Sequence, residues 1–173
     1  HEIRTPMNGI VGVTDLLLKT PVSARQRDYL TTISSSASSL LRIIDDILDF
    51  SRIEAGKLAL EELDFNIARL VDEVVELLGP QAAAKKIDIT VALEKDVPPR
   101  LRADPSRIRQ VLVNLVSNAV KFTGEGGVVV HASVQHDERK GVLRIRVKDS
   151  GVGIAEDHLR HLFEAFTQAD SST

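Results

Sequence analysis

Apolar residues recur at helical spacing near the start of the chain. Within residues 1–19, Ile3, Ile10 and Leu17 stand seven positions apart, about two helical turns, and Val13 lies between them. This spacing predicts a helix. Pro6 lies inside the pattern and would kink the helix unless it falls in the first turn. Pro21 and Ser23 then predict a short break.

The strongest helical signal covers residues 24–54. Its apolar positions alternate between spacings of three and four, which is the heptad seam of a coiled coil. They are Leu30, Ile33, Ala37, Leu40, Ile44 and Ile47. A helical hairpin of this length buries little apolar surface alone, so we expect two copies to pair into a four-helix bundle. The alternative is that the hairpin packs only on its own second half.

The pattern changes after Ala55-Gly56-Lys57, which is a predicted hinge. Strands are expected at 57–66, 87–93, 128–134 and 142–147, and helices at 67–84, 105–122 and 155–165. Asp104 can cap the helix that starts at Pro105, and Gly124 is expected to end it. A helix pair followed by a mixed layer predicts an α+β fold with two domains, residues 1–56 and 57–173.

Composition excludes several classes of function. Aromatic residues make up 3% of the 173 residues, so there is no aromatic platform for nucleic-acid bases. The net charge is −3 and the basic residues are dispersed, which disfavours nucleic acid and acidic membranes as partners. The absence of cysteine excludes a disulfide framework, a zinc-thiolate site and a thiol nucleophile. No apolar run approaches the ~20 residues that span a bilayer, so we expect a cytoplasmic segment without membrane contact.

Three polar residues of the helix 105–122 form a stripe beside its apolar face. Asn114, Asn118 and Lys121 are four and three residues apart and therefore neighbours on the helix surface. Amide oxygens and a lysine in this arrangement could hold Mg²⁺ and phosphate oxygens. Taken alone, the stripe is also compatible with a plain solvated helix face.

A second candidate site follows the last strand. Asp149 has the same parity as the inward apolar positions of that strand, so its carboxylate should face the interior and accept a hydrogen bond from an exocyclic amine such as that of adenine. Gly151 and Gly153 would let the backbone approach a flat ligand closely. An isolated Asp-X-Gly-X-Gly string is usually only a turn, but together with the asparagine stripe it indicates a nucleotide site.

His1 is the third candidate. Glu2 could orient or deprotonate its imidazole, and Thr5 lies one helical turn further on the same face. A neutral imidazole nitrogen is a competent nucleophile at cellular pH. As an isolated histidine, His1 could equally be a surface residue or a tag remnant.

Four segments resemble the motifs of sensor histidine kinases and occur in the order of that family. Residues 1–6 (HEIRTP) resemble the H box, 114–123 the N box, 149–154 the first glycine box and 162–168 the phenylalanine-rich box. The N box and the phenylalanine-rich box are closest in style to those of hybrid kinases, which carry receiver domains further along. The resemblance implies a dimeric four-helix bundle followed by an incomplete α/β sandwich of the histidine-kinase/gyrase-type ATPase superfamily.

The resemblance also implies roles for the candidate residues. ATP would lie in the sandwich, with Asp149 on the adenine amine and Asn118 as the Mg²⁺ ligand. Positions that shape the pocket or lie near the phosphates would be Gly151, Gly153, Asn114 and Lys121. Phe163 and Phe166 would connect the sandwich to a nucleotide lid.

In the implied reaction His1 attacks the γ-phosphoryl group, with Glu2 as its acid/base neighbour. The phosphoryl group then passes to an aspartate of a receiver domain, either on a response regulator or on the same hybrid protein. Thr5 matches a position that helps to place water for phosphatase activity in relatives. The second glycine box and the lid are expected after Thr173 and a helix segment before His1, so this portion alone should bind nucleotide weakly and phosphorylate itself little.

Other functions stay open at this point. An ATP-hydrolysing relative would need a glutamate where this chain has Asn114, which cannot act as a base. A dimerising scaffold without kinase activity, or a parent protein that acts mainly as a phosphatase, would conserve much of the same pattern. The sequence leaves open the stimulus and whether the whole protein is anchored in a bacterial inner membrane.

Overall fold

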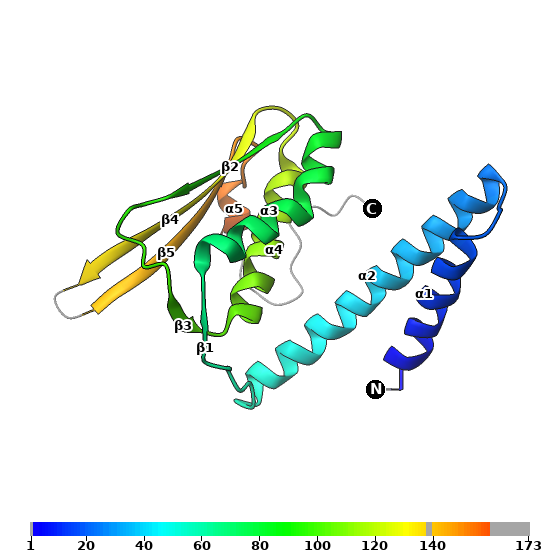
Figure 1. Cartoon of the computed structure of the whole chain (residues 1–173), viewed down its shortest axis with the longest axis horizontal. Helices are drawn as coiled ribbons and strands as arrows, with labels where there is room; N and C mark the ends of the chain where they lie inside the picture. The colour runs from blue at the N-terminus through cyan, green and yellow to red at the C-terminus, as the bar shows by residue number, and fades with distance from the viewer. Residues whose placement is uncertain (1, 138–139, 160–173) are drawn as a thin grey trace. The chain divides into compact units, whose positions relative to one another are not determined.

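The computed structural model describes residues 2–137 and 140–159. The chain divides into two compact units, one extending to Ala59 and the other beginning at Leu60 (Figure 1). None of the helices in the described ranges is both long and apolar enough to cross a membrane.

The first unit is a helical hairpin of α1 (Arg4–Leu18) and α2 (Ala24–Glu54), as the apolar pattern predicts. Pro6 is the third residue of α1, within the first turn, where amide donors have no intrahelical partner, so it does not break the helix. At the start of α2, the Ser23 side chain accepts from the Gln26 backbone N–H, and the Gln26 side chain accepts from the Ser23 backbone N–H. This capping box explains why the second helix begins where it does.

The heptad seam of α2 divides into two sets of positions. Leu30 and Ile44 are half-buried and Ala37 is buried, so this set lies against α1. The other set is exposed: Ile33 at 46%, Leu40 at 44% and Ile47 at 45%. The apolar positions predicted for α1 are exposed as well, namely Ile3, Ile10, Val13 and Leu17. The hairpin therefore buries one apolar row internally and leaves a second row uncovered.

The second unit contains two helices packed on a sheet, with a small two-stranded sheet beside them. Its elements are β1 (Leu63–Phe65), α3 (Ile67–Ala84), β2 (Asp88–Leu93), β3 (Leu101–Ala103), α4 (Pro105–Phe122), β4 (Gly127–Asp137), β5 (Lys140–Asp149) and α5 (Glu156–Leu159). The larger sheet has the order β2-β4-β5, with β2 parallel and β5 antiparallel to β4. The observed architecture is the α+β fold that the sequence predicts.

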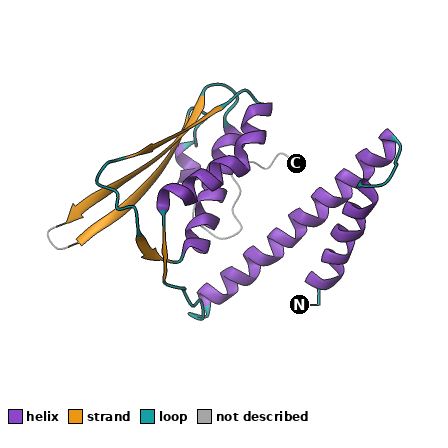
Figure 2. Ribbon diagram, in the orientation of Figure 1, coloured by secondary structure: helices purple, strands orange, loops and turns teal. Residues whose placement is uncertain are grey.

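Helices α3 and α4 cover one face of the three-stranded sheet (Figure 2). The central strand β4 turns Val128, Val130 and Ala132 toward the helices, and all three are buried. The buried residues that α3 and α4 contribute are Ile67, Leu70, Val71, Val74, Leu78, Ala82, Leu112, Val116, Ala119 and Val120. The core is thus aliphatic, as the low aromatic content requires.

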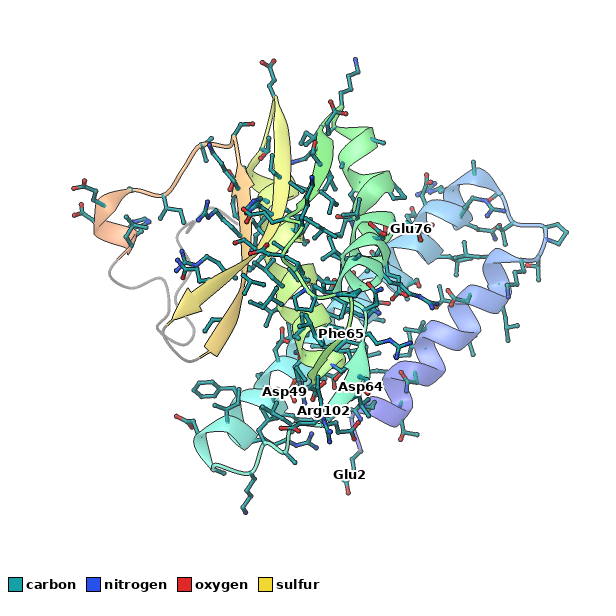
Figure 3. The ribbon with its side chains drawn as sticks, turned by 60° about the vertical axis from the view of Figure 1, so that its left-hand side comes forward. Glu2, Asp49, Asp64, Phe65, Glu76 and Arg102 are labelled. Atoms are coloured by element: carbon teal, nitrogen blue, oxygen red, sulfur yellow. The ribbon has the colours of Figure 1, made fainter. Side chains whose placement is uncertain are left out.

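Part of the strand prediction is wrong. Residues 57–66 form only the three-residue strand β1, and β3 is not predicted at all. These short segments pair antiparallel with each other, and Asp64 of β1 lies opposite Arg102 of β3 (Figure 3). Segments of three residues are too short to show a periodic pattern, and only the pairing identifies them as strands. The predicted helix 155–165 is described only through α5, and its remainder lies outside the described residues.

The predicted end of α4 is right, but the predicted cause is wrong. The helix stops at Phe122, and Thr123 caps it with extended backbone at φ −88° and ψ 125°. Gly124 does not have the positive φ of a glycine cap; in this loop it is Gly126 that does, at 102°. The carbonyl groups at the end of α4 accept hydrogen bonds from another element, as shown below for Lys85.

Candidate functional site

The polar stripe predicted on α4 is exposed along its whole length. Asn114, Asn118 and Lys121 are all accessible to solvent. Apolar side chains share this exposed face: Val111 is 56% exposed, Leu115 47% and Phe122 41%. A plain solvated helix face would not carry apolar residues so regularly, so this surface is suited to being covered by a ligand or by further protein.

Asp149 ends β5, opposite Val128 of β4. Its parity is that of the helix-facing residues of the strand, as predicted, but its side chain is exposed and does not lie in the interior. The strand ends at this residue, so nothing further along the strand covers the carboxylate. Its Oδ1 accepts a hydrogen bond from the Gly151 backbone N–H at 2.9 Å. This bond closes the turn and does not involve the other carboxylate oxygen, Oδ2.

Gly151 brings the two predicted parts of the nucleotide site together. A Cβ at this position would lie 2.6 Å from the Phe122 carbonyl oxygen and 2.8 Å from Asp149 Oδ1, distances that no side chain tolerates. The turn after β5 therefore packs directly on the last residue of α4, and this glycine is required by protein packing as well as by any ligand. Gly153 has φ +73°, the left-handed region that glycine adopts without strain.

Ser150 is a residue of the site that the sequence interpretation overlooked. Its Oγ accepts from the Gly127 backbone N–H at 3.0 Å and donates to the Glu125 carbonyl oxygen at 3.0 Å. Its own backbone N–H donates to the Gly127 carbonyl at 3.2 Å. Ser150 thus ties the glycine loop after α4 to the Asp149 turn. The sequence signal that could have identified Ser150 was its position between the two predicted site residues Asp149 and Gly151.

Two further groups lie at the end of α4. The Lys121 ammonium nitrogen lies 4.8 Å from the centre of the Phe122 ring, a cation–π contact. Thr123 is fully buried, and its Oγ1 has no hydrogen-bond partner among the described residues. A buried hydroxyl of this kind normally has a hydrogen-bond partner.

The predicted phosphoacceptor site is described only in part. His1 and the phenylalanine-rich segment with Phe163 and Phe166 lie outside the described residues, so their roles remain predictions. Glu2 is exposed and extends away from the start of α1 (Figure 3), and Thr5 is exposed in the first turn of α1.

The neighbouring Arg4 donates to Asp45 Oδ1 of α2 at 2.5 Å. This ion pair joins the first turn of α1 to α2. It therefore restrains the segment that carries the predicted acceptor.

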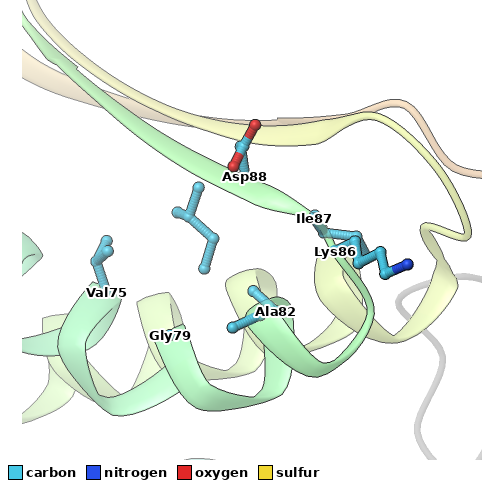
Figure 4. A pocket seen from close by; sticks show the side chains of 8 residues that line it. Val75, Gly79, Ala82, Lys86, Ile87 and Asp88 are labelled. Atoms are coloured by element: carbon cyan, nitrogen blue, oxygen red, sulfur yellow. The ribbon is translucent and has the colours of Figure 1, made fainter.

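Two hollows on the described part of the surface do not coincide with the predicted site. One of about 360 Å³ lies between α3 and β2, lined by residues that include Val75, Ile87 and Asp88 (Figure 4). The other, of about 320 Å³, is lined by residues that include Arg69, Glu73 and Arg109. The Glu73 carboxylate bridges both arginines, and hydrogen bonds from Arg109 and then Arg69 lower the pKa of Glu73. Neither hollow contains a residue predicted to bind nucleotide.

The donor set of the site fits Mg²⁺ held jointly with a phosphate, and not a preformed metal cage. Among the described residues there is no group of three or more His, Asp and Glu side chains that could hold a metal ion. Asn118 offers a single exposed amide oxygen, and Mg²⁺ typically takes one or two protein oxygens and completes its shell with phosphate and water.

Two family models match the chain. The His Kinase A (phospho-acceptor) domain matches residues 1–56. The histidine kinase-, DNA gyrase B- and HSP90-like ATPase matches residues 103–173.

Curated relatives match over nearly the whole chain. Sensor protein GacS of Pseudomonas syringae pv. syringae is 50% identical over 99% of this chain and 19% of its own length. The hybrid signal transduction histidine kinase F of Dictyostelium discoideum is 42% identical over 100% of this chain and 16% of its own length. The chain therefore spans about a fifth of the length of such relatives.

Solved structures are similar as well. Full-length ShkA in complex with AMPPNP matches with a TM-score of 0.80 and 40% identity, over 98% of this chain and 36% of ShkA. Histidine kinase ThkA in complex with response regulator protein TrrA matches with a TM-score of 0.61 and 30% identity, over 97% of this chain and 48% of ThkA.

Proposed function

The chain belongs to the sensor histidine kinases, and on that premise we propose that it carries the phosphoacceptor and ATP-binding parts of a hybrid phosphorelay kinase. The proposed domains are residues 1–56 for dimerisation and phosphoacceptance and 57–173 for ATP binding. The proposed reaction consumes ATP, which supports a cytoplasmic location for this segment.

One observation carries the proposal. The end of α4, with its exposed Asn118 and Lys121, packs directly on the Asp149 turn through the contact between Phe122 and Gly151. An amide stripe and a carboxylate from two distant sequence motifs thereby belong to one surface. ATP presents an exocyclic amine and a polyphosphate, the two chemical groups that such a surface recognises.

The assignments follow from the chemistry of each side chain. Asp149 Oδ2 accepts a hydrogen bond from the adenine amino group, since Oδ1 already accepts one from the Gly151 backbone N–H. Asn118 would hold Mg²⁺, and Asn114 and Lys121 would lie near the phosphates. Mg²⁺ when bound supplies neutralisation of phosphate charge.

In the proposed reaction an imidazole nitrogen of His1 attacks the γ-phosphorus of ATP. The bond from that phosphorus to the bridging oxygen breaks, ADP departs with the electron pair, and Glu2 takes the proton of the imidazole. A receiver aspartate then attacks the phosphorus of the phosphohistidine, Glu2 returns the proton to the ring as the P–N bond breaks, and His1 leaves as neutral imidazole. Thr5 would position water for a phosphatase activity, in which water removes the phosphoryl group from the receiver aspartate.

Two protein partners belong to the proposal. The exposed apolar row of the hairpin supports pairing with a second copy into a four-helix bundle. The similarity to ThkA in complex with a response regulator supports a receiver domain as the acceptor of the phosphoryl group. An ATP-hydrolysing function is disfavoured because Asn114 cannot act as the base that activates a water molecule.

The test is phosphorylation of the whole natural protein that contains this chain, with γ-labelled ATP and Mg²⁺. The wild type should acquire acid-labile, alkali-stable label, as a phosphoramidate does, and His1→Gln and Asn118→Asp should lose at least about 99% of it, since each removes a group on which transfer depends. His158→Gln, which alters an exposed histidine of α5, is the matched control and should label normally.

The outcomes separate the competing functions. Label that persists in His1→Gln would contradict His1 as the acceptor. Nucleotide binding by the wild type without any label would favour the scaffold or phosphatase and make Thr5 the next residue to change.

A further inference from the structure

The end of α4 lacks the glycine cap that often satisfies the last carbonyl groups of a helix. Thr123 continues in extended backbone, and its N–H bonds the Ala119 carbonyl at 3.0 Å. No backbone N–H of the loop Gly124–Gly127 donates to the carbonyls of Val120 or Lys121. Such carbonyls need a donor from elsewhere when they are not exposed to water.

Lys85 supplies that donor from another element. Its Nζ donates to the Lys121 carbonyl at 2.6 Å, the Val120 carbonyl at 2.9 Å and the Thr123 carbonyl at 3.3 Å. An ammonium group has three N–H donors, so all of them are used here. A cation at the C-terminus of a helix is also favoured by the helix dipole.

The position of Lys85 is itself well defined. It is the C-cap of α3, and its backbone N–H bonds the Ala82 carbonyl. The next residue, Lys86, has the positive φ of 59° that turns the chain into β2. Lys85 therefore links the end of α3 to the end of α4. Both lysines are exposed, but Lys86 makes no hydrogen bond to the end of α4.

The clamped end of α4 is the part of the helix that touches the nucleotide site. The Phe122 carbonyl oxygen, between two carbonyls held by Lys85, is the atom against which Gly151 packs. A shift of this turn would move Lys121 and displace the Asp149 turn. Both groups are needed at once for adenine and phosphate recognition.

We propose that Lys85 is a positioning residue for nucleotide binding, holding the C-terminal turn of α4 in register with the Asp149 turn. The inference rests on the proposed ATP site. Lys85 does not contact the nucleotide; it raises the fraction of molecules in which the two halves of the site are correctly placed. When that fraction falls, the apparent affinity for the nucleotide falls in direct proportion.

The experiment compares Lys85→Met, Lys85→Arg and Lys86→Met in the whole natural protein. Titration with AMPPNP and Mg²⁺ in a calorimeter gives Kd, and labelling with ATP gives KM and kcat. Lys85→Met should raise Kd and KM about tenfold, the loss expected when a charge-assisted bond of this strength is removed, while kcat at saturation changes less than about twofold. Lys85→Arg should recover most of the affinity, and Lys86→Met should match the wild type.

Hydrogen exchange gives a readout that does not depend on nucleotide. The backbone N–H groups of Thr123 and Ser150 form the hydrogen bonds that hold the two turns. Both amides should exchange faster in Lys85→Met than in the wild type, and at the wild-type rate in Lys86→Met. Equal Kd values for Lys85→Met and the wild type, or an equal fall of affinity in Lys86→Met, would overturn the positioning role.

Two further outcomes separate the inference from the function on which it rests. If the Thr123 and Ser150 amides of the wild type are protected from hydrogen exchange but the wild type does not bind AMPPNP, the proposed ATP site is overturned, and the inference with it. A wild type that binds, with Lys85→Met unfolded and Lys85→Arg not restoring affinity, would assign Lys85 to stability alone and overturn only the inference.

Discussion

Asp104 shows how much a single side chain determines in this fold. Its Oδ1 accepts from the Ser106 and Arg107 backbone N–H groups at 3.0 and 3.1 Å and from Ser106 Oγ at 2.5 Å. Its Oδ2 accepts from the Glu61 backbone N–H at 3.1 Å. The cap was predicted from the Asp-Pro pair, but the bond to Glu61 was not. One carboxylate thus starts α4 and fastens the segment before β1.

This carboxylate should give the second unit a measurable acid sensitivity. The hydrogen bond from Ser106, followed by the backbone bonds from Glu61 and Arg107, lowers the pKa of Asp104 from 3.8 to about 2. Because the folded pKa lies below the unfolded one, the stabilisation is complete above about pH 3.8 and is lost as the pH falls toward 2. Asp104→Asn keeps a capping oxygen but cannot accept from Glu61 as a carboxylate does.

The measurement is thermal unfolding between pH 7 and pH 2. Asp104→Asn should melt below the wild type at neutral pH, and the difference should shrink over the range in which Asp104 protonates. Asp96→Asn, at an exposed loop carboxylate, is the control and should follow the wild type. A difference that stays constant down to pH 2 would show that ionisation of Asp104 does not stabilise the fold.

At the scale of elements, the helices start and stop for local reasons more often than the strands do. The bounds of α2, α3 and α4 follow from apolar periodicity and from the side-chain caps of Ser23, Asn66 and Asp104. The end of α4 is the exception, since Lys85 satisfies its carbonyls from a position 35 or more residues away in the chain.

The capping box of α2 gives an element-scale prediction. Ser23→Ala should lower the free energy of unfolding of the hairpin by about 1 kcal/mol, because it removes the acceptor for the Gln26 N–H. Ser38→Ala, at an exposed site in the middle of the same helix, should raise it by about 0.5 kcal/mol through helix propensity. Urea unfolding followed by far-ultraviolet circular dichroism measures both changes. Equal effects of the two substitutions would contradict the assigned cap.

At the scale of the whole molecule, the hairpin is incomplete by itself. Ile33, Leu40 and Ile47 are spaced by one heptad and remain exposed after α1 has packed on α2. The exposed residues of α1 add to this surface. An exposed apolar row of this length is typical of an interface between helices.

Dimerisation provides the corresponding prediction. Leu40→Asp places a charge in the exposed row and should shift the protein from dimer to monomer, raising the dissociation constant by at least about 100-fold. Sedimentation equilibrium of the whole protein measures the change, and Ser38→Asp, close by on the same helix but outside the row, is the matched control. A wild type that is monomeric at micromolar concentration would exclude the four-helix bundle.

The sequence by itself determined the features that arise within a few residues. The period of apolar positions and the caps determined the helices, and the four motif segments pointed to the family to which the chain belongs. Each of these is local, because helix hydrogen bonds and caps join residues no more than four positions apart.

Only the tertiary structure decided which surfaces meet. The pairing of β1 with β3, the exposure of one apolar row of α2, the contact of Gly151 with Phe122 and the clamp of Lys85 join residues far apart in the sequence. Their existence depends on the packing of whole elements, and the short strands and the isolated lysine carry no periodic signal of their own. The parts of the candidate site can therefore be predicted from sequence, whereas the way they are held together is a property of the fold.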